Sequence, residues 1–335
     1  MAKRGMSKPS GPGARGLLPK VFYLCPDHRE PSWGVGMLYR HVAILRRHGF
    51  DAAVLHQRAP FRLTWLASDV PVQYAEHIGV SPASTDVLVV PDVLAASTFA
   101  RQWPGRRTVF VQGAFTILPG LAGATDYRSL GYTDAMAVLP SVQAVVARHF
   151  GVPAFTVPPC IAQEFFVDRD SLTRGPRERR ILVTPAKIAS PDREVFSALL
   201  AAHLVGSGGW SALELQGYSH VEVARLMQSS AILVNTNLGE AFNTTVPEAM
   251  AAGCIAVCYE AFGGRDFLES GRNAHVFPNH YVFPLLDRLF DVMGQFESLD
   301  SRIVGMRQRA YETALRFTEA QTEQALLGFM ERIVS

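Results

Sequence analysis

Two carboxylates belong to one segment in the second half of the sequence, one within a polar loop and one just after it. Glu240 lies inside the loop, and Glu248 follows eight residues later. The loop comes after the apolar run 231–234, which has the pattern of a buried strand. It ends at Pro247, a residue type that favours the first position of a helix, and the two threonines before it can cap that helix. A strand, a polar loop and a capped helix are therefore predicted in succession.

This succession has a chemical meaning. A helix that begins at the carboxyl end of a parallel strand offers unpaired N–H groups and a partial positive charge, which suit a diphosphate. Carboxylates beside such a site are unsuited to the phosphate itself. They can accept hydrogen bonds from the hydroxyls of a ribose or a sugar, or stabilise positive charge that develops at an anomeric carbon.

Four further residues could contact a ligand. Gly34 and Gly36 lack the third glycine of a dinucleotide fingerprint, and we interpret them as a loop where the backbone approaches a ligand closely. Tyr218 could stack on a base or be an ordinary aromatic at the rim of a site. Lys187 is the only lysine after residue 20. It is either a compact charge placed for a ligand or a surface lysine retained by chance.

The composition narrows the class of protein. A length of 335 residues predicts two domains, and 48% apolar with 19% charged residues is typical of a globular chain. No apolar run reaches the ~18 residues of a membrane-spanning helix, and the first twenty residues lack the apolar core of a secretory signal. The four cysteines are too few for a disulfide scaffold. We therefore expect a cytoplasmic protein.

Charge is distributed unevenly along the chain. The formal charge is +2, and residues 1–20 contain five basic residues and no acidic one, which leaves −3 on the rest. A mildly acidic body argues against a nucleic-acid-binding protein. Residues 1–20 are also rich in glycine and proline, so they are predicted to be a disordered tail. Its charge could give weak contact with the inner membrane surface, or the tail could serve only solubility.

Strands and helices alternate through most of the chain, a pattern typical of α/β proteins with mostly parallel sheets. Gly49 is placed to end the first helix. The predicted strands are 21–25, 52–56, 86–90, 108–112, 135–139, 181–184, 213–216, 231–234, 255–258 and 274–277, and the predicted helices are 37–48, 142–150, 193–204, 221–227, 247–252 and most of 303–334.

The polar segment 167–180 is the one charge-dense break in this alternation, and we interpret it as a linker. It separates a Rossmann-like domain over residues 21–166 from a second one over residues 181–300. Residues 301–335 are predicted to form helices that pack back across both domains. Two doubly wound domains leave a cleft between the carboxyl ends of their sheets, where ligands bind in this architecture.

These features together resemble the GT-B glycosyltransferases, and specifically glycosyltransferase family 4. The pair Glu240-x7-Glu248, followed by Ala-Met-Ala-Ala-Gly and by Gly263-Gly264, resembles the donor-site signature of that family. The segment from Gly34 to Gly49 resembles its opening glycine loop and first helix, and matches fall along most of residues 20–280. The resemblance implies two doubly wound, Rossmann-like domains that face a central cleft, the first for the acceptor and the second for the donor.

The resemblance also implies an activity. It would be transfer of a sugar from a nucleotide-sugar donor to a glycan, glycolipid or small-molecule acceptor, with retention at the anomeric carbon, no cofactor and no essential metal. Glu248 matches the residue that holds the donor ribose, and Glu240 the one that contacts the donor sugar near the reacting centre. The loop between them would present N–H groups to sugar and phosphate, and comprises Phe242, Asn243, Thr244 and Thr245.

A basic pair neutralises the diphosphate in this family, and here the match is incomplete. Lys187 matches the first member, Asp192 occupies the second position, and Arg193 is adjacent. Gln112 stands where the family often has a histidine. The second domain also lacks about one strand–helix unit between residues 204 and 213.

These departures keep two other functions open. One is a catalytically silent relative that binds sugar nucleotides, and the other is a sugar-nucleotide epimerase or hydrolase, because fold alone does not separate them. The segment Asp168-Arg169-Asp170 fits the D-x-D metal motif of the other glycosyltransferase fold. Because it lies in the predicted linker and such spacing is common by chance, no metal site is predicted there.

Overall fold

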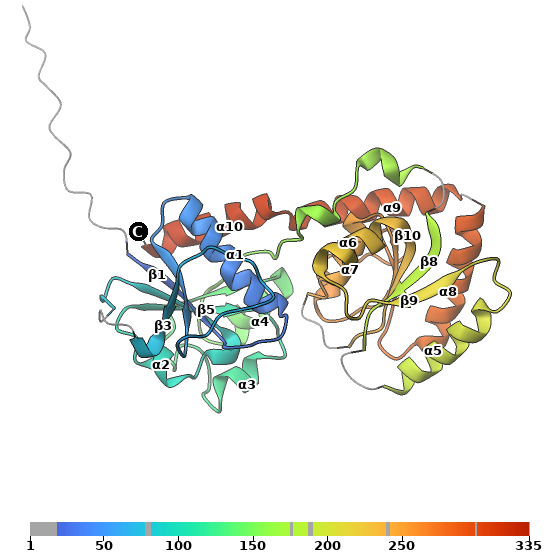
Figure 1. Ribbon diagram of the computed structural model, residues 1–335. Coiled ribbons are helices and arrows are strands. Elements are labelled where there is room, and N and C mark those ends of the chain that lie inside the picture. The colour runs from blue at the N-terminus through green and yellow to red at the C-terminus, as the bar shows by residue number, and fades with distance from the viewer. Residues whose placement is uncertain are drawn as a thin grey trace, which may run out of the picture.

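The computed structural model describes residues 19–77, 82–174, 177–186, 190–238, 242–298 and 300–334. Residues 1–18 of the predicted tail lie outside the described residues. Its end at Lys20 is held beside the first strand, because the Lys20 N–H donates to Asp86 Oδ1 at 3.1 Å. Two sheets with their helices lie side by side (Figure 1). The predicted α/β class is confirmed.

The first sheet has seven parallel strands in the order β3-β2-β1-β4-β5-β6-β7. Its central strands are buried along their whole length, as a parallel sheet covered on both faces requires. The two edge strands were not predicted, because each has three residues and is only partly buried. The strands are β1 (Val21–Cys25), β2 (Ala52–His56), β3 (Val72–Tyr74), β4 (Val87–Pro91), β5 (Arg106–Val111), β6 (Asp134–Ala137) and β7 (Ala154–Thr156).

The first helix, α1 (Trp33–Arg47), begins four residues earlier than predicted. Ser32 is its N-cap, with an extended backbone and a hydroxyl that accepts from the Val35 N–H at 3.5 Å. Gly34 and Gly36 therefore lie in the first helical turn, and the prediction that they form a loop is wrong. The Gly36 N–H donates to the Ser32 carbonyl at 3.0 Å, so the helical hydrogen bonding already includes this residue. The other helices of this half are α2 (Thr98–Arg101), α3 (Ile117–Leu121) and α4 (Pro140–His149).

The second sheet has five parallel strands in the order β12-β11-β10-β8-β9. Successive residues of β8 point to opposite faces. Ile181 and Val183 therefore pack in one apolar core and Leu182 in another. The strands are β8 (Glu178–Val183), β9 (Ser211–Glu214), β10 (Ser230–Asn235), β11 (Ile255–Tyr259) and β12 (His275–Phe277), and the helices are α5 (Pro191–Leu204), α6 (His220–Ser229), α7 (Thr245–Ala251), α8 (Val282–Glu297) and α9 (Ser301–Ala314).

The segment between the two sheets is shorter than predicted. Glu178–Arg180 already belongs to β8, where Glu178 is in register with Ser230 and Arg180 with Ser211. The start of β8 was predicted too late because its first three residues, Glu178-Arg179-Arg180, are all charged and look like a solvated segment in the sequence. A short 3-10 helix, Arg169–Leu172, lies within the remaining segment.

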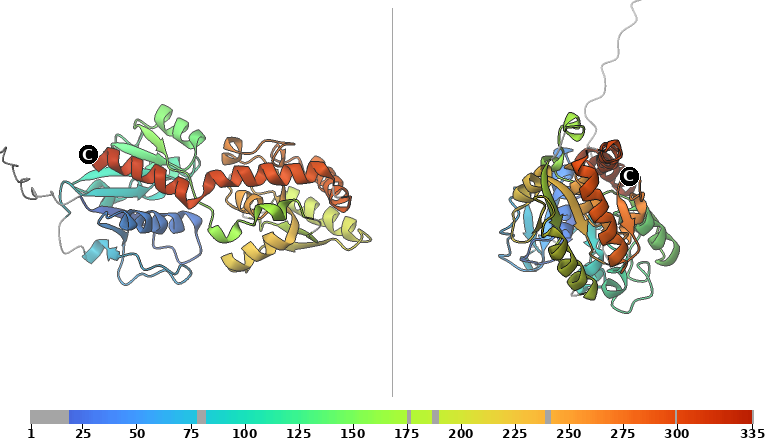
Figure 2. Two further views of the ribbon diagram at one scale, coloured as in Figure 1. Left: turned by 90° about the horizontal axis from the view of Figure 1, so that it is seen from above. Right: turned by 90° about the vertical axis from the view of Figure 1, so that its right-hand side faces the viewer.

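The chain returns to the first half at its end. Helix α10 (Glu319–Val334) continues from α9 and lies along the first half (Figure 2). The Arg106 guanidinium donates to the Ile333 carbonyl at 2.8 Å, and Phe329 packs on Phe155 at a ring distance of 5.7 Å. The two halves are therefore held together at both the central segment and the C-terminal helices. Within the described part of the chain, no helix is both long and apolar enough to cross a bilayer.

Candidate functional site: the cleft between the two sheets

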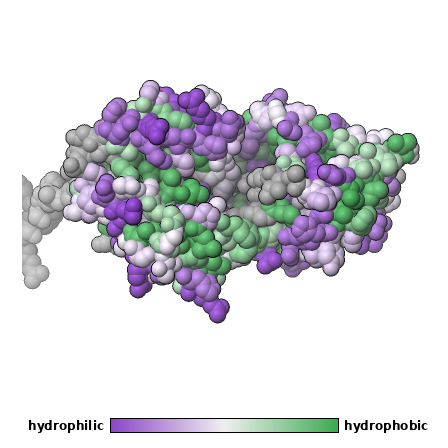
Figure 3. Space-filling view, turned by 90° about the horizontal axis from the view of Figure 1, so that it is seen from below, coloured by the Kyte–Doolittle hydropathy of each residue, from purple (hydrophilic) through white to green (hydrophobic). Residues whose placement is uncertain are grey.

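A cavity of about 1350 Å³ lies between the two halves, and Figure 3 shows the notch that separates them. Helix α1 and the segments after β4 and β5 line one side. The starts of α6 and α7 line the other. All of these segments follow the carboxyl ends of parallel strands, where open α/β sheets bind ligands. The cleft therefore lies where the sequence predicts it.

Glu248 is the carboxylate that the structure places in this cleft. It lies in the first turn of α7, and 8% of the residue is exposed. Burial raises the pKa of Glu248, and a hydrogen bond from His220 opposes that effect. A carboxylate that is almost buried but still partly exposed to the cleft can accept hydrogen bonds from the hydroxyl groups of a ligand that enters it.

Helix α7 begins at Thr245, two residues before Pro247, so the prediction that the proline opens the helix is wrong. The N-cap Thr244 already has a helical backbone, and its hydroxyl makes no capping bond. The Val246 N–H donates to the Asn243 carbonyl at 3.0 Å and the Glu248 N–H to the Thr244 carbonyl at 3.1 Å, and Pro247 has no N–H, so this helix start offers few donors to a ligand. Both threonines line the cleft.

Asn243 is fixed in the left-handed region of the backbone, with φ of +57°, which asparagine tolerates better than most residues. Its Oδ1 accepts from Asn235 Nδ2 at 2.6 Å. Its Nδ2 is buried and has no hydrogen-bond partner among the described residues. Because an unsatisfied buried donor costs free energy, this amide is suited to bind a polar ligand atom in the cleft.

Phe242 contributes packing through its side chain. The ring is 3% exposed and contacts Phe317 at 4.9 Å and Trp33 of α1 at 5.9 Å between ring centroids. This aromatic cluster joins the two halves beside the cleft. The Phe242 side chain is therefore engaged in packing between the halves, and the residue also lines the cleft.

Two predicted site residues, Glu240 and Lys187, lie outside the described residues. Arg193 is described, and its guanidinium is engaged elsewhere. It donates to the Thr184 carbonyl at 2.9 Å and pairs with Glu214 at 3.1 Å. Asp192 pairs with His280 Nδ1 at 2.8 Å. The structure therefore does not bring Arg193 to the lining of the cleft.

Gly34, Gly36 and Tyr218 do line the cleft. The Gln112 side-chain amide donates to the Gly34 carbonyl at 2.8 Å, and a Cβ on Gly34 would lie 2.5 Å from Gln112 Oε1. A side chain at position 34 would therefore displace the end of the Gln112 side chain. Gly36 has no atom within 4 Å of the place where a Cβ would be, so its small size leaves open space in the cleft.

Asp92 is a cleft residue that the sequence analysis missed. It directly follows β4, it is 1% exposed, and burial raises its pKa to about 6. The Thr116 hydroxyl donates to its carboxylate. The signal that could have identified it is its place immediately after a buried parallel strand, the same signal that marks the Glu240 loop. His220, at the start of α6, was missed as well.

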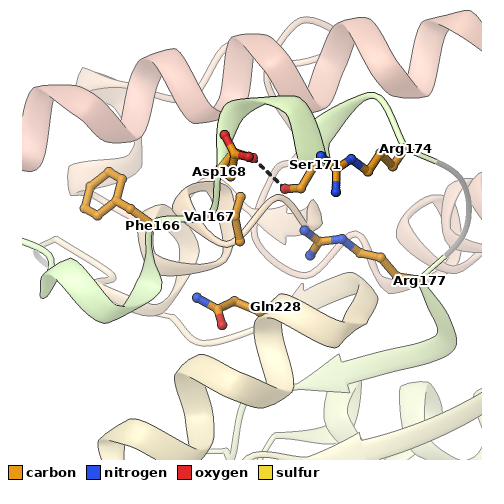
Figure 4. Close-up of a pocket in the computed structure, with 7 residues that line it drawn as sticks. All are labelled: Phe166, Val167, Asp168, Ser171, Arg174, Arg177 and Gln228. Atoms are coloured by element: carbon orange, nitrogen blue, oxygen red, sulfur yellow. Dashed lines mark hydrogen bonds between the residues drawn. The ribbon is translucent and has the colours of Figure 1, made fainter.

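A second cavity of about 470 Å³ lies on the segment after β7 and against α6 (Figure 4). Arg177 points into it, yet its guanidinium already donates to the Met227 and Ala252 carbonyls. Asp168 of the D-x-D segment also lines this cavity and caps the 3-10 helix that follows it. Across the described ranges, no group of three or more His, Cys, Asp or Glu side chains could hold a metal ion.

Comparison with known proteins gives the fold a family context. Residues 193–292 match the family model described as glycosyl transferases group 1. No curated protein sequence matches the chain. Solved structures do match along nearly the whole chain.

A glycosyltransferase from Rickettsia africae is 12% identical, with a TM-score of 0.70 over 95% of this chain and 99% of that one. HepE from Anabaena, solved in complex with UDP, is 10% identical, with a TM-score of 0.66 over 93% and 100%. The lipopolysaccharide outer core galactosyltransferase WaaB, in its apo form, is 12% identical, with a TM-score of 0.64 over 93% and 99%. These structures show that the chain has the fold of GT-B glycosyltransferases, and the family model matches residues 193–292 within its second half.

Proposed function

We propose that the protein is a retaining, metal-independent glycosyltransferase of family 4 that moves a sugar from a nucleotide-sugar donor to a glycan, glycolipid or small-molecule acceptor. The observation that carries the proposal is that the cleft lining holds both the nearly buried Glu248 carboxylate and Asn243, whose Nδ2 has no hydrogen-bond partner among the described residues. Together they offer acceptors for ribose hydroxyls and a donor for a sugar or phosphate oxygen.

In the proposed reaction, the oxygen of an acceptor hydroxyl bonds to the anomeric carbon on the face from which the diphosphate departs, the bond from that carbon to the diphosphate breaks, and the hydroxyl proton passes to the departing diphosphate. The leaving nucleoside diphosphate takes the electron pair, so positive groups near it lower the barrier. Lys187 is proposed to be such a positive group. Glu240 is proposed to stabilise the positive charge that develops on the sugar.

Thermal-shift measurements with a panel of nucleoside diphosphates test the donor site. UDP is the first candidate, because HepE was solved in complex with UDP. A ligand at 100 times its Kd stabilises the native state by about 2.7 kcal/mol, which is readily seen as a rise in Tm. We expect one diphosphate to raise the Tm more than its nucleoside does. A Tm that no nucleotide or nucleotide sugar changes would contradict the proposal.

The substitution Gly36→Ala tests whether the small size of Gly36 makes room for the ligand. A Cβ at this helical position meets no protein atom within 4 Å, and alanine favours a helix over glycine by up to ~1 kcal/mol. We therefore expect an unchanged or higher Tm together with at least several-fold weaker nucleotide-sugar binding, measured by calorimetry. Gly294→Ala is the matched control, because Gly294 is a helical glycine of α8 with equal space and lies outside the cleft lining. Equal affinities in both variants would remove Gly36 from the ligand site.

A further inference from the structure

His220 lies between two carboxylates at the edge of the donor side of the cleft. Its Nε2 is 3.4 Å from Glu248 Oε1, and its Nδ1 is 3.5 Å from Glu164 Oε1. Glu248 belongs to α7, and Glu164 belongs to the short 3-10 helix Gln163–Phe165 that follows β7. His220 therefore connects Glu248, the residue proposed to bind the ribose, to the segment that leads out of the first sheet.

The position of His220 is fixed by the start of α6. Ser219 is the N-cap, and with Glu222 it forms a reciprocal capping box: the Glu222 N–H donates to Ser219 Oγ, and the Ser219 N–H donates to Glu222 Oε2 at 2.8 Å. The imidazole also packs edge-on against the Phe165 ring at 4.8 Å between centroids. Backbone and ring are thus both held, so the two nitrogens face the two carboxylates in a defined way.

We propose that protonated His220 is the positioning residue for Glu248, and that the proton on His220 is a condition of tight nucleotide-sugar binding. The inference rests on the proposed function of the cleft. With its proton, His220 holds Glu248 Oε1 and leaves Oε2 to accept from a ribose hydroxyl. It also adds a positive charge to the cleft lining, where an anionic nucleotide sugar would bind.

The electrostatic surroundings support this assignment. The hydrogen bond to Glu248 raises the pKa of His220 above its ordinary value of 6.5, with Glu164 adding to the effect and burial opposing it. A helix N-terminus disfavours a cation, so the two carboxylates must outweigh it. Of the elements that pack on the start of α6, the 3-10 helix contributes Glu164, α7 contributes Glu248, and β10 contributes no charged residue. Glu222, on α6 itself, is bound to Ser219.

The sign of the pH dependence follows from the direction of this shift. A raised pKa means that His220 carries its proton at pH 6.5 and loses it as the pH rises through its pKa in the folded protein, so the charged contact with Glu248 is lost on the alkaline side. Donor affinity is therefore expected to fall in that window. Because the imidazole is half exposed, the fall should be modest, about threefold to tenfold.

Calorimetric titration with UDP-glucose, or with another nucleotide sugar chosen by the thermal-shift panel, tests this between pH 5.5 and 8. Such a diphosphate diester does not titrate there, so the slope belongs to the protein. We expect wild-type affinity to fall as pH rises, and His220→Gln to bind weakly and without that slope. Glu164→Gln should keep the slope and move its midpoint to lower pH. His203→Gln, whose ring stacks on Phe290 outside the cleft lining, should behave as wild type.

NMR titration of the histidine side chains provides a readout that needs no ligand. The His220 signal, identified by its absence in His220→Gln, should titrate above pH 6.5 in the wild type and at lower pH in Glu248→Gln. A His220 that titrates at or below 6.5, or an equal pH slope in wild type and His220→Gln, would overturn the inference alone. Absence of nucleotide-sugar binding at every pH would overturn the proposed function and the inference together.

Discussion

Replacing Glu240 with Gln is expected to reduce sugar transfer by on the order of 100-fold or more. The substitution keeps the shape of the side chain and removes the charge that is proposed to stabilise the reacting sugar. Fold and nucleotide affinity should remain nearly unchanged, because a residue in a polar loop contributes little to either core. The measurement is the steady-state rate of sugar transfer, together with Tm and calorimetric affinity for the nucleoside diphosphate.

Glu312→Gln is the control for this prediction, since it removes an equal charge from an exposed position of α9. Turnover of Glu240→Gln at the rate of this control would remove the catalytic assignment. A loss of Tm in Glu240→Gln alone would instead assign the residue a structural role.

Glu248→Ala is expected to act on binding. Loss of a charge-assisted hydrogen bond to the ribose should weaken nucleoside diphosphate binding by roughly 1–3 kcal/mol, which is about fivefold to 150-fold in Kd. Calorimetry with a ribonucleotide and its 2′-deoxy and 3′-deoxy analogues measures the effect. The wild type should prefer the ribonucleotide to at least one deoxy analogue, and the variant should lose that preference. An undiminished affinity in Glu248→Ala would contradict the assignment of Glu248 to the ribose.

The sequence predicted the sheets well because buried parallel strands are continuous apolar runs. The strand before the Glu240 loop is such a run, and it is β10 in the structure. The same rule locates Glu248, since the segment after a central strand must face the cleft. Short edge strands such as β3 (Val72–Tyr74) were not predicted, because partial burial leaves no apolar run to detect.

Helix starts were predicted less well, for a physical reason. Proline and glycine are informative only about local backbone preference, whereas the position of the first turn also depends on contacts that these two residue types do not reveal. Ser32 therefore starts α1 ahead of two glycines, and α7 begins before Pro247 without a side-chain cap. The contacts of His220 and Arg193 depend on carboxylates that are distant in sequence, namely Glu164, Glu248 and Glu214, so no local pattern could have identified their partners.

The most direct test of the central claim follows donor turnover by proton NMR, with the nucleotide sugar selected by the thermal-shift panel and a set of sugar, lipid-linked and small aglycone acceptors. We expect release of the nucleoside diphosphate together with a product that keeps the anomeric configuration of the donor. An inverted product would contradict the retaining mechanism. A donor that binds and stays intact would show a silent relative, and a nucleotide sugar that is epimerised while still linked to its diphosphate would show an epimerase.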